Sequence, residues 1–167
     1  MRLFDLKTYK FSKFRIITFS CLFVVVLIVD QWTKSWARQN IKGDPRYFSD
    51  LDIGFVFATN SGSAFSLFSN STIYISIIAI VVVIILLFAI FKTERNIVSM
   101  SYMFISVGAL GNLIDRFTQP PYGGQGEVTD FIHIGWWPTF NIADSMITAG
   151  AVLLVLSAIF QGQKSDA

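Results

Sequence analysis

The sequence predicts an all-α membrane protein with four transmembrane helices and a small extracytoplasmic β element in the loop between helices 1 and 2. Three observations favour this fold class. Apolar residues make up 53% of the chain and charged residues only 14%, against roughly 25% in a soluble domain. The mean hydropathy is +0.58. Four apolar segments each approach the roughly 20 residues with which a helix crosses a bilayer core.

The first predicted span covers residues 15–36. It carries no charge from Ile16 to Val29 and continues as a helix through Asp30 and Lys34. A basic segment followed by an apolar run is also typical of a cleaved signal peptide. Cleavage there would leave an odd number of spans and discard Asp30 and Lys34, so we interpret the segment as the first helix.

The other predicted spans cover residues 72–91, 97–116 and 141–160. A tight turn separates the second span from the third, whereas the other two connections are long. The first long connection contains aromatic and β-branched residues between Tyr47 and Asn60, which predicts a strand or hairpin. We expect residues 1–167 to form a single integral membrane domain.

Basic residues near the spans predict the orientation. Eight lie in the N-terminal segment, the turn between the second and third spans, and the C-terminal tail, whereas five lie on the opposite face. Because basic residues accumulate on the cytoplasmic side, both termini are predicted to be cytoplasmic.

Composition also excludes several classes of site. A net charge of +2 gives no reason to expect a nucleic-acid partner. One cysteine, Cys21, and one histidine, His133, argue against Cys-rich metal sites and Ser-His-Asp chemistry. We expect no metal and no cofactor. His133 is interpreted as an interfacial loop residue, and Trp136 and Trp137 as an interface anchor.

Polar residues concentrate at one membrane face. Consecutive helices alternate in direction, so the ends of the first and third spans lie beside the starts of the second and fourth. The residues gathered there are Asp30, Lys34, Asn112, Asp115, Arg116, Asp130, Asn141 and Asp144. Ionisable residues at membrane depth cost a few kcal/mol each, and they indicate a functional site by default.

Residue spacing suggests how this polar layer is organised. Asp30 and Lys34 are four residues apart with the acid first, the favourable order for an ion pair. We interpret this pair as structural rather than catalytic. Asn112, Asp115 and Arg116 share one helix face, and the preceding glycines permit close helix packing. The helix dipole alone would favour an acid at Asp144.

Asp130 and Asp144 are the predicted reactive pair. If they face one another, burial and like-charge repulsion would raise one pKa, so that the two carboxyls share a proton. One could then act as a base toward water while the protonated member polarises a scissile carbonyl. Because such a pair titrates as a unit, we assign neither role to either residue.

Five blocks, in order along nearly the whole chain, resemble the motifs of lipoprotein signal peptidase (signal peptidase II). These blocks are Asp30–Lys34 (DQWTK), Asn60–Ser66 (NSGSAFS), Gly108–Arg116 (GALGNLIDR), Val128–Ile132 (VTDFI) and Phe140–Ser145 (FNIADS). Any one block is a weak signal, whereas five in order with four spans are specific.

The resemblance implies a membrane aspartic endopeptidase of the bacterial cytoplasmic (inner) membrane. It would remove signal peptides from diacylglyceryl-modified prolipoproteins, cutting just before the lipidated cysteine at the extracytoplasmic face. Asp130 and Asp144 match the family's catalytic pair. The residues that match substrate-binding or supporting positions are Asp30, Lys34, Asn60, Gly62, Asn112, Asp115, Arg116 and Asn141.

The resemblance also implies partners. They are the lipid-modified prolipoprotein, membrane lipid and a globomycin-type cyclic peptide as inhibitor, and we expect the chain to act as a monomer. The chain departs from the family's pattern at Ser63, where many members have Ala, and at Thr129, where Val is usual. The stretch from Thr118 to Gly126 is longer than in many members, and we predict that residues 120–126 form a movable cover over the acids.

Two other function classes remain open. A small proton-coupled transporter would also place acids in a helical bundle, but it needs a polar path through both halves of the membrane, and the inner halves of the second and fourth spans are aliphatic. A serine/lysine protease using Lys34 with Ser63 or Ser66 is chemically feasible. It leaves Asp130 and Asp144 unexplained.

Overall fold

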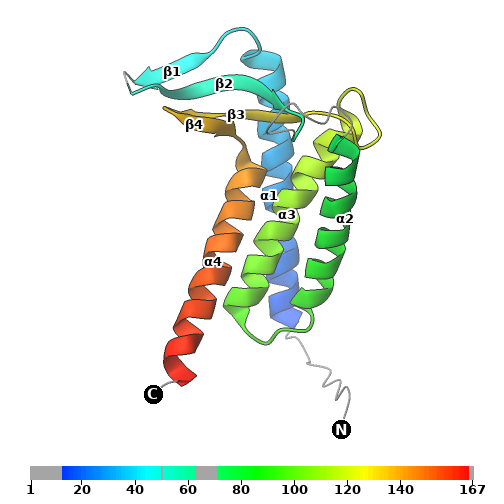
Figure 1. The fold of residues 1–167 in the computed structure, drawn as a ribbon, viewed down its shortest axis with the longest axis vertical. Helices are drawn as coiled ribbons and strands as arrows, with labels where there is room; N and C mark the ends of the chain where they lie inside the picture. The colour runs from blue at the N-terminus through cyan, green and yellow to red at the C-terminus, as the bar shows by residue number, and fades with distance from the viewer. Residues whose placement is uncertain (1–12, 50, 63–70, 166–167) are drawn as a thin grey trace.

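The computed structural model describes residues 13–49, 51–62 and 71–165, and within these ranges it contains four long helices (Figure 1). They are α1 (Lys13–Asn40), α2 (Ser71–Ile90), α3 (Asn96–Thr118) and α4 (Ile142–Ser165). All four are long and apolar enough to cross a membrane, which confirms the predicted fold class. The start of α1 and the end of α4 lie at the same end of the bundle.

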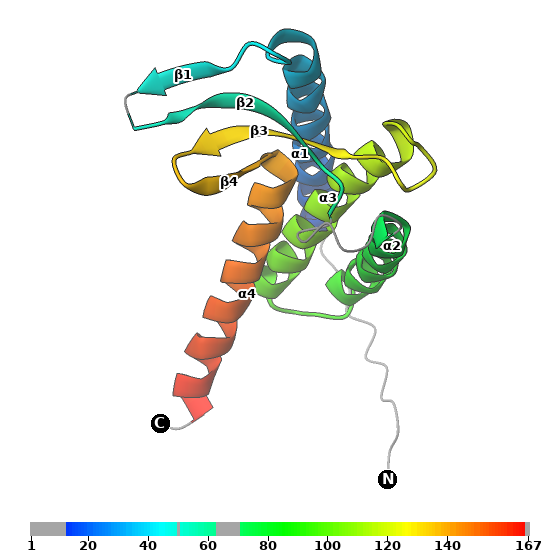
Figure 2. The ribbon, with the colours of Figure 1, turned by 45° about the horizontal axis from the view of Figure 1, so that its top comes forward.

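A four-stranded antiparallel sheet lies at the opposite end of the helices (Figure 2). Its strands, in spatial and chain order, are β1 (Arg46–Ser49), β2 (Ile53–Asn60), β3 (Val128–Ile134) and β4 (Trp137–Phe140). The β element predicted between the first two helices is therefore confirmed.

Two strands of the sheet come from the connection between α3 and α4, which the sequence did not predict. The interpretation of His133 as a loop residue is wrong, because His133 belongs to β3 and pairs with Gly54 of β2. Its ring also lies 3.1 Å from an Asp52 carboxylate oxygen. Pairing with a distant strand supplied the hydrogen bonds that order this segment.

The helix α3 lies at the centre of the bundle and packs against the other three helices. Its contact with α4 depends on small residues, as the sequence predicted. A Cβ atom at Gly108 would lie only 2.3 Å from the Ala143 carbonyl oxygen, and one at Gly150 would lie 2.7 Å from that of Ser101. Larger residues at these positions would force the two backbones apart.

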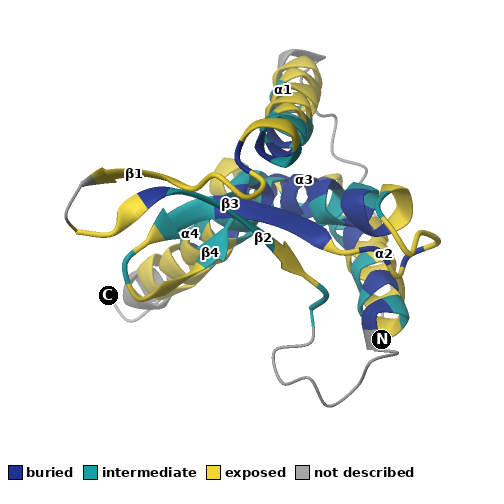
Figure 3. Cartoon of the chain, turned by 90° about the horizontal axis from the view of Figure 1, so that it is seen from above, coloured by how far each residue is buried: buried dark blue, intermediate teal, exposed yellow. Residues whose placement is uncertain are grey.

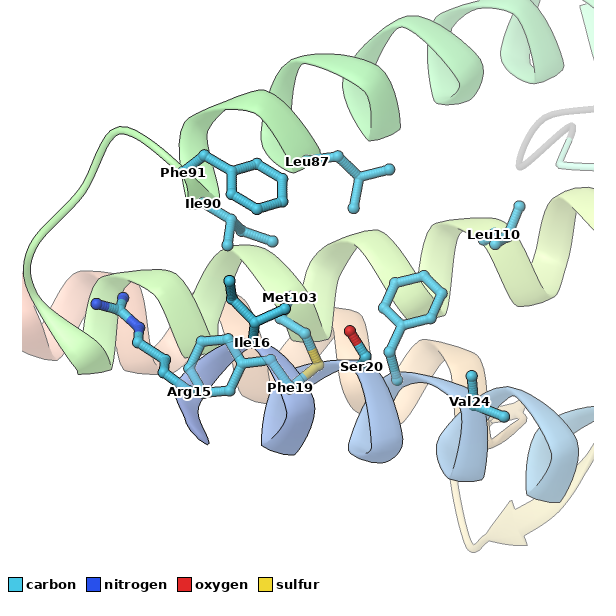
Figure 4. Close-up of a pocket in the computed structure, with 11 residues that line it drawn as sticks. Arg15, Ile16, Phe19, Ser20, Val24, Leu87, Ile90, Phe91, Met103 and Leu110 are labelled. Atoms are coloured by element: carbon cyan, nitrogen blue, oxygen red, sulfur yellow. The ribbon is translucent and has the colours of Figure 1, made fainter. Parts of the chain in front are cut away.

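The two ends of the bundle have different interiors. At the end away from the sheet, Ile90, Met103 and Val107 form an apolar cluster. A groove of about 380 Å³ lies between α1, α2 and α3 there, lined mainly by apolar side chains (Figure 4). At the sheet end, Ala37, Ile41 and Phe131 join α1 to β3, which is the most buried strand (Figure 3).

Candidate active site

Asn141 connects the two predicted reactive acids. Asp130 is a buried residue of β3, and Asp144 lies half-buried in the first turn of α4. The side-chain nitrogen Nδ2 of Asn141 donates to Asp130 Oδ1 at 2.7 Å, and its backbone N–H donates to Asp144 Oδ2 at 3.2 Å. The Asp144 backbone N–H donates in return to Asn141 Oδ1 at 2.8 Å, which completes a reciprocal helix cap.

Asn112 holds the other oxygen of Asp144. Its Nδ2 donates to Asp144 Oδ1 at 2.8 Å, while its Oδ1 accepts hydrogen bonds from Lys34 Nζ at 2.9 Å and Asn141 Nδ2 at 3.2 Å. Two donors facing Oδ1 fix the orientation of the amide, so its nitrogen must point at the acid. Asn112 therefore lies in the predicted site, with its side chain engaged by protein partners.

Lys34 is the centre of a buried ionic network, as the predicted ion pair suggested. Its ammonium nitrogen lies 3.0 Å from Asp30 Oδ2 and 3.8 Å from Asp115 Oδ2, and all three residues are at most 1% exposed. Asp30 Oδ1 also accepts a hydrogen bond from the Ala143 backbone N–H at 2.9 Å. Asp30 and Lys34 thus join α1 to α3 and α4, and Lys34 is linked to Asp144 through Asn112.

Gly111 makes this approach of α1 to α3 possible. A Cβ atom at Gly111 would lie 2.6 Å from Asp30 Oδ2, closer than real Cβ contacts. The Gly111 carbonyl oxygen also accepts a hydrogen bond from Gln31 Nε2 at 2.9 Å.

Arg38 is a site residue that sequence reasoning missed. Its Nη1 donates to Thr129 Oγ1 at 2.8 Å and to Asp115 Oδ1 at 3.4 Å. In the sequence, Arg38 is one of the five basic residues on the face opposite the termini. Nothing local distinguished it, because its partners lie 77 and 91 residues away in the chain.

Arg116 connects α3 to the segment after β2. Its Nη1 donates to the Ser61 carbonyl oxygen at 3.2 Å, and its charge interacts with those of Asp130 and Asp144. Gly62 has a φ of +77°, and a Cβ there would lie 2.8 Å from Arg116 Nη2. The Gly62 N–H donates to Asn60 Oδ1 at 2.7 Å, so a turn places the Asn60 side chain at the site.

Burial is the largest cause of an altered acidity at Asp130. Burial first and the charge of Asp144 second raise the pKa of this carboxyl to about 7, against the opposing effects of hydrogen bonds from Asn60 and Asn141 and of the charge of Lys34. A carboxyl with this pKa can exchange a proton near neutral pH. Among the described residues, no three His, Cys, Asp or Glu side chains lie close enough together to hold a metal ion.

The predicted cover at residues 120–126 is anchored at one end. The N–H groups of Gly124 and Gly126 both donate to the Arg116 carbonyl oxygen, and Ser76 Oγ donates to the Gly124 carbonyl oxygen at 2.6 Å. Tyr122 is exposed beside Gly123, where a Cβ would meet nothing within 4 Å. Movement of this tip remains a prediction.

Comparison with known proteins links this arrangement to one family. The model of the family described as signal peptidase (SPase) II matches residues 22–160. A lipoprotein signal peptidase of Mycobacterium bovis is 39% identical over 142 residues, covering 82% of this chain and 68% of that protein. One of Syntrophomonas wolfei is 34% identical over 148 residues, covering 86% and 94%.

A solved structure agrees with this match. A bacterial membrane enzyme determined by the in meso method at 1.9 Å resolution superimposes with a TM-score of 0.75 at 31% identity. The superposition covers 86% of this chain and 93% of that one.

Proposed function

The chain belongs to the signal peptidase II family, and from this premise we propose that it is an aspartic endopeptidase acting on prolipoproteins. It is a multi-pass bacterial membrane peptidase that removes their signal peptides. In our proposal Asp130 and Asp144 are the catalytic dyad, the substrate carries a diacylglyceryl group, and the cut falls just before the lipidated cysteine.

The observation that carries this proposal is the bonding of both acids to one residue. Asn141 donates to Asp130 through its side chain and to Asp144 through its backbone, so the two carboxyls are held in a fixed relation. The charge of Asp144 is also among the causes of the raised pKa of Asp130. Two carboxyls that interact in this way can share one proton, as an aspartic mechanism requires.

The reaction follows from that shared proton. The ionised carboxyl takes a proton from water, whose oxygen attacks the scissile carbonyl carbon, while the protonated carboxyl donates to the carbonyl oxygen. The tetrahedral intermediate collapses when the amide nitrogen receives a proton from one carboxyl and a hydroxyl of the intermediate returns a proton to the other. The C–N bond then breaks, the new carboxyl forms and the dyad again holds one proton. Asp144 is only half-buried, so water can reach the pair.

Substrate contacts are proposed for the residues around the dyad. Arg116 and the Asn60–Gly62 turn offer donors and a carbonyl edge to an extended peptide, and Arg116 already bonds the Ser61 carbonyl. Asn112, Asp30, Lys34 and Asp115 are assigned supporting roles because their polar atoms bond one another. A globomycin-type cyclic peptide would compete for this peptide-binding edge.

Conversion of each acid to its amide tests the dyad. Asp130→Asn and Asp144→Asn should each lower kcat/KM on a diacylglyceryl-modified prolipoprotein by at least about 10³-fold, because an amide cannot exchange the proton. Asp52→Asn is the matched control, since Asp52 is an exposed acid of the same sheet end. Substantial turnover by either dyad variant with normal folding would disprove the assignment.

The serine/lysine alternative has less support. Lys34 is buried and bonded to Asp30 and Asn112, whereas a lysine base must hold a neutral amine that faces the nucleophile. Ser63 and Ser66 lie outside the described residues. The transporter alternative needs a polar path at the end away from the sheet, where apolar side chains dominate the cluster around Met103.

We also propose that the sheet end faces outward from the cytoplasmic membrane, with both termini inside. In a Cys21→Ser background, a membrane-impermeant thiol reagent applied to intact cells should label Lys42→Cys at the sheet end. It should leave Lys92→Cys at the other end unlabelled. Both positions are exposed, so accessibility differs only in membrane side. Labelling of Lys92→Cys alone would reverse the orientation.

A further inference from the structure

We propose that Arg38 and Thr129 form a positioning clamp that holds the backbone of β3 where it presents Asp130 to the substrate. This inference rests on the proposed function, because it assumes that the Asp130 carboxyl takes part in hydrolysis. Arg38 bonds Thr129 and Asp115, so it acts on that carboxyl through Thr129 and is a positioning residue.

The polar atoms of Thr129 are all held from outside the β2–β3 pair. Its hydroxyl accepts a hydrogen bond from Arg38 Nη1 at 2.8 Å, and its backbone N–H donates to Asp115 Oδ2 at 2.9 Å. Its carbonyl oxygen accepts from Asn141 Nδ2 at 3.2 Å. That carbonyl belongs to the peptide bond joining Thr129 to Asp130, so these bonds fix the position from which the Asp130 side chain leaves the strand.

The sheet alone holds this position less firmly. Asp130 pairs with Ala58, and Ile132 pairs with Phe55. The interval from Phe55 to Ala58 in β2 is therefore one residue longer than the interval from Asp130 to Ile132 in β3, which makes the ladder irregular beside Asp130. A strand next to such a bulge loses regular hydrogen bonds that would fix its course. Contacts from α1, α3 and the start of α4 to Thr129 compensate for that loss.

The carboxylate of Asp115 also holds the clamp in place. Asp115 is fully buried, and its carboxylate lies 3.4 Å from Arg38 Nη1 and 3.8 Å from Lys34 Nζ. Its Oδ1 therefore meets the same Arg38 nitrogen that bonds Thr129, while its Oδ2 accepts from the Thr129 N–H. The closed set of three residues resists rotation of any one side chain, because each contributes two of the contacts.

The decisive variant is Thr129→Val, which keeps the shape of the side chain, removes the hydroxyl and leaves Arg38 without that acceptor. Because Val is usual in the family at this position, the variant measures how far this chain depends on its own Arg38–Thr129 bond. We expect kcat on a diacylglyceryl-modified prolipoprotein to fall about tenfold, with KM within twofold, because binding of the substrate is not altered. Thr129→Ser retains the acceptor and should recover kcat to within threefold of the wild type. Arg38→Gln should reproduce the loss in kcat.

A double variant tests whether Arg38 and Thr129 act through the same hydrogen bond. Thr129→Val added to Arg38→Gln should lower kcat by less than twofold beyond Arg38→Gln alone, because the shared hydrogen bond is already absent. Arg46→Gln is the matched control: Arg46 is an exposed arginine whose Nη2 bonds the Asn40 carbonyl at the same end of α1. It should leave kcat unchanged.

The outcomes distinguish the clamp from the dyad. Wild-type kcat in Thr129→Val, in a protein whose Asp130→Asn variant is inactive, would overturn the clamp and leave the dyad intact. Equal losses in Thr129→Val and Thr129→Ser that follow a lowered melting temperature would also overturn it, because they indicate folding alone. An active Asp130→Asn enzyme would instead overturn the proposed function.

Discussion

The two ends of the helical bundle satisfy their buried polar groups in different ways. In the half away from the sheet, the buried hydroxyls of Ser101 and Ser106 each donate to a carbonyl four residues earlier in the same helix, and the buried Ser99 hydroxyl accepts a hydrogen bond from Arg15 of α1. In the half beside the sheet, the buried side chains of Asp30 and Lys34 bond groups on other helices, up to 113 residues away in the chain.

This difference indicates where substitutions change function. A hydroxyl bonded within its own helix needs no partner elsewhere, so its removal leaves the neighbouring elements in place. A charge bonded across elements fixes their relative positions, and its loss leaves an uncompensated partner in a low-dielectric interior. We therefore expect activity to depend on the sheet half and to be nearly independent of polar groups in the other half.

Lys34→Met should give the largest effect. It removes the buried cation that lies 3.0 Å from Asp30 and 3.8 Å from Asp115, so among the described contacts Asp30 loses its ion-pair partner, whereas Asp115 keeps Arg38. The expected cost is about 3–5 kcal/mol in the free energy of unfolding. Thermal melting in detergent measures it. The control Lys42→Met changes an exposed lysine near the Phe57 ring and should melt like the wild type. A stable Lys34→Met enzyme would show that the ionic network is dispensable.

Arg116→Ala should have the next largest effect and should act on catalysis more than on folding. The variant loses the hydrogen bond to the Ser61 carbonyl and the positive charge that interacts with both acids. We expect kcat/KM to fall about 100-fold, corresponding to about 2.7 kcal/mol of transition-state stabilisation. Arg95→Ala, at the opposite end of the same helix, is the control and should retain full activity. Parallel loss of folded protein and activity would instead assign Arg116 a structural role.

The pH dependence of kcat/KM should report the dyad. Burial raises the pKa of Asp130 to about 7, so the free enzyme loses the shared proton as the pH rises through that value. At pH 8.5, 1.5 units higher, kcat/KM should be about 30-fold below its plateau. A pH-rate profile with no decline up to pH 9 would contradict this assignment.

The raised pKa of Asp130 should also make the free energy of unfolding depend on pH. Its pKa is raised above the value of about 3.9 in an unfolded chain, so the folded state binds more protons between pH 4 and 7. The free energy of unfolding should therefore decrease as the pH rises through this window. In Asp130→Asn that part of the decrease should disappear, which melting curves at pH 5 and 7.5 would detect.

Features that depend on a local pattern could be predicted from the sequence, whereas contacts between distant segments could not. The apolar runs and their lengths predicted all four helices, because a bilayer demands a local pattern that can be counted. The ion pair of Asp30 with Lys34 was also predictable, since both residues lie on one helix. The contacts of Arg38 and the strands β3 and β4 were missed, because their hydrogen bonds join segments with no local signal of each other.

Ser106→Ala should give the smallest effect. The Ser106 hydroxyl donates to the Tyr102 carbonyl at 2.7 Å, and that carbonyl keeps its helical partner when the hydroxyl is removed. The free energy of unfolding should change by less than about 0.5 kcal/mol, and kcat/KM should stay within twofold of the wild type. The same assay and melting conditions as for Arg116→Ala make the two results comparable. A tenfold loss of kcat/KM in Ser106→Ala would mean that the apolar half also positions the dyad, because Ser106 lies on the same helix as Asn112 and Arg116 and could reach them only by moving that helix.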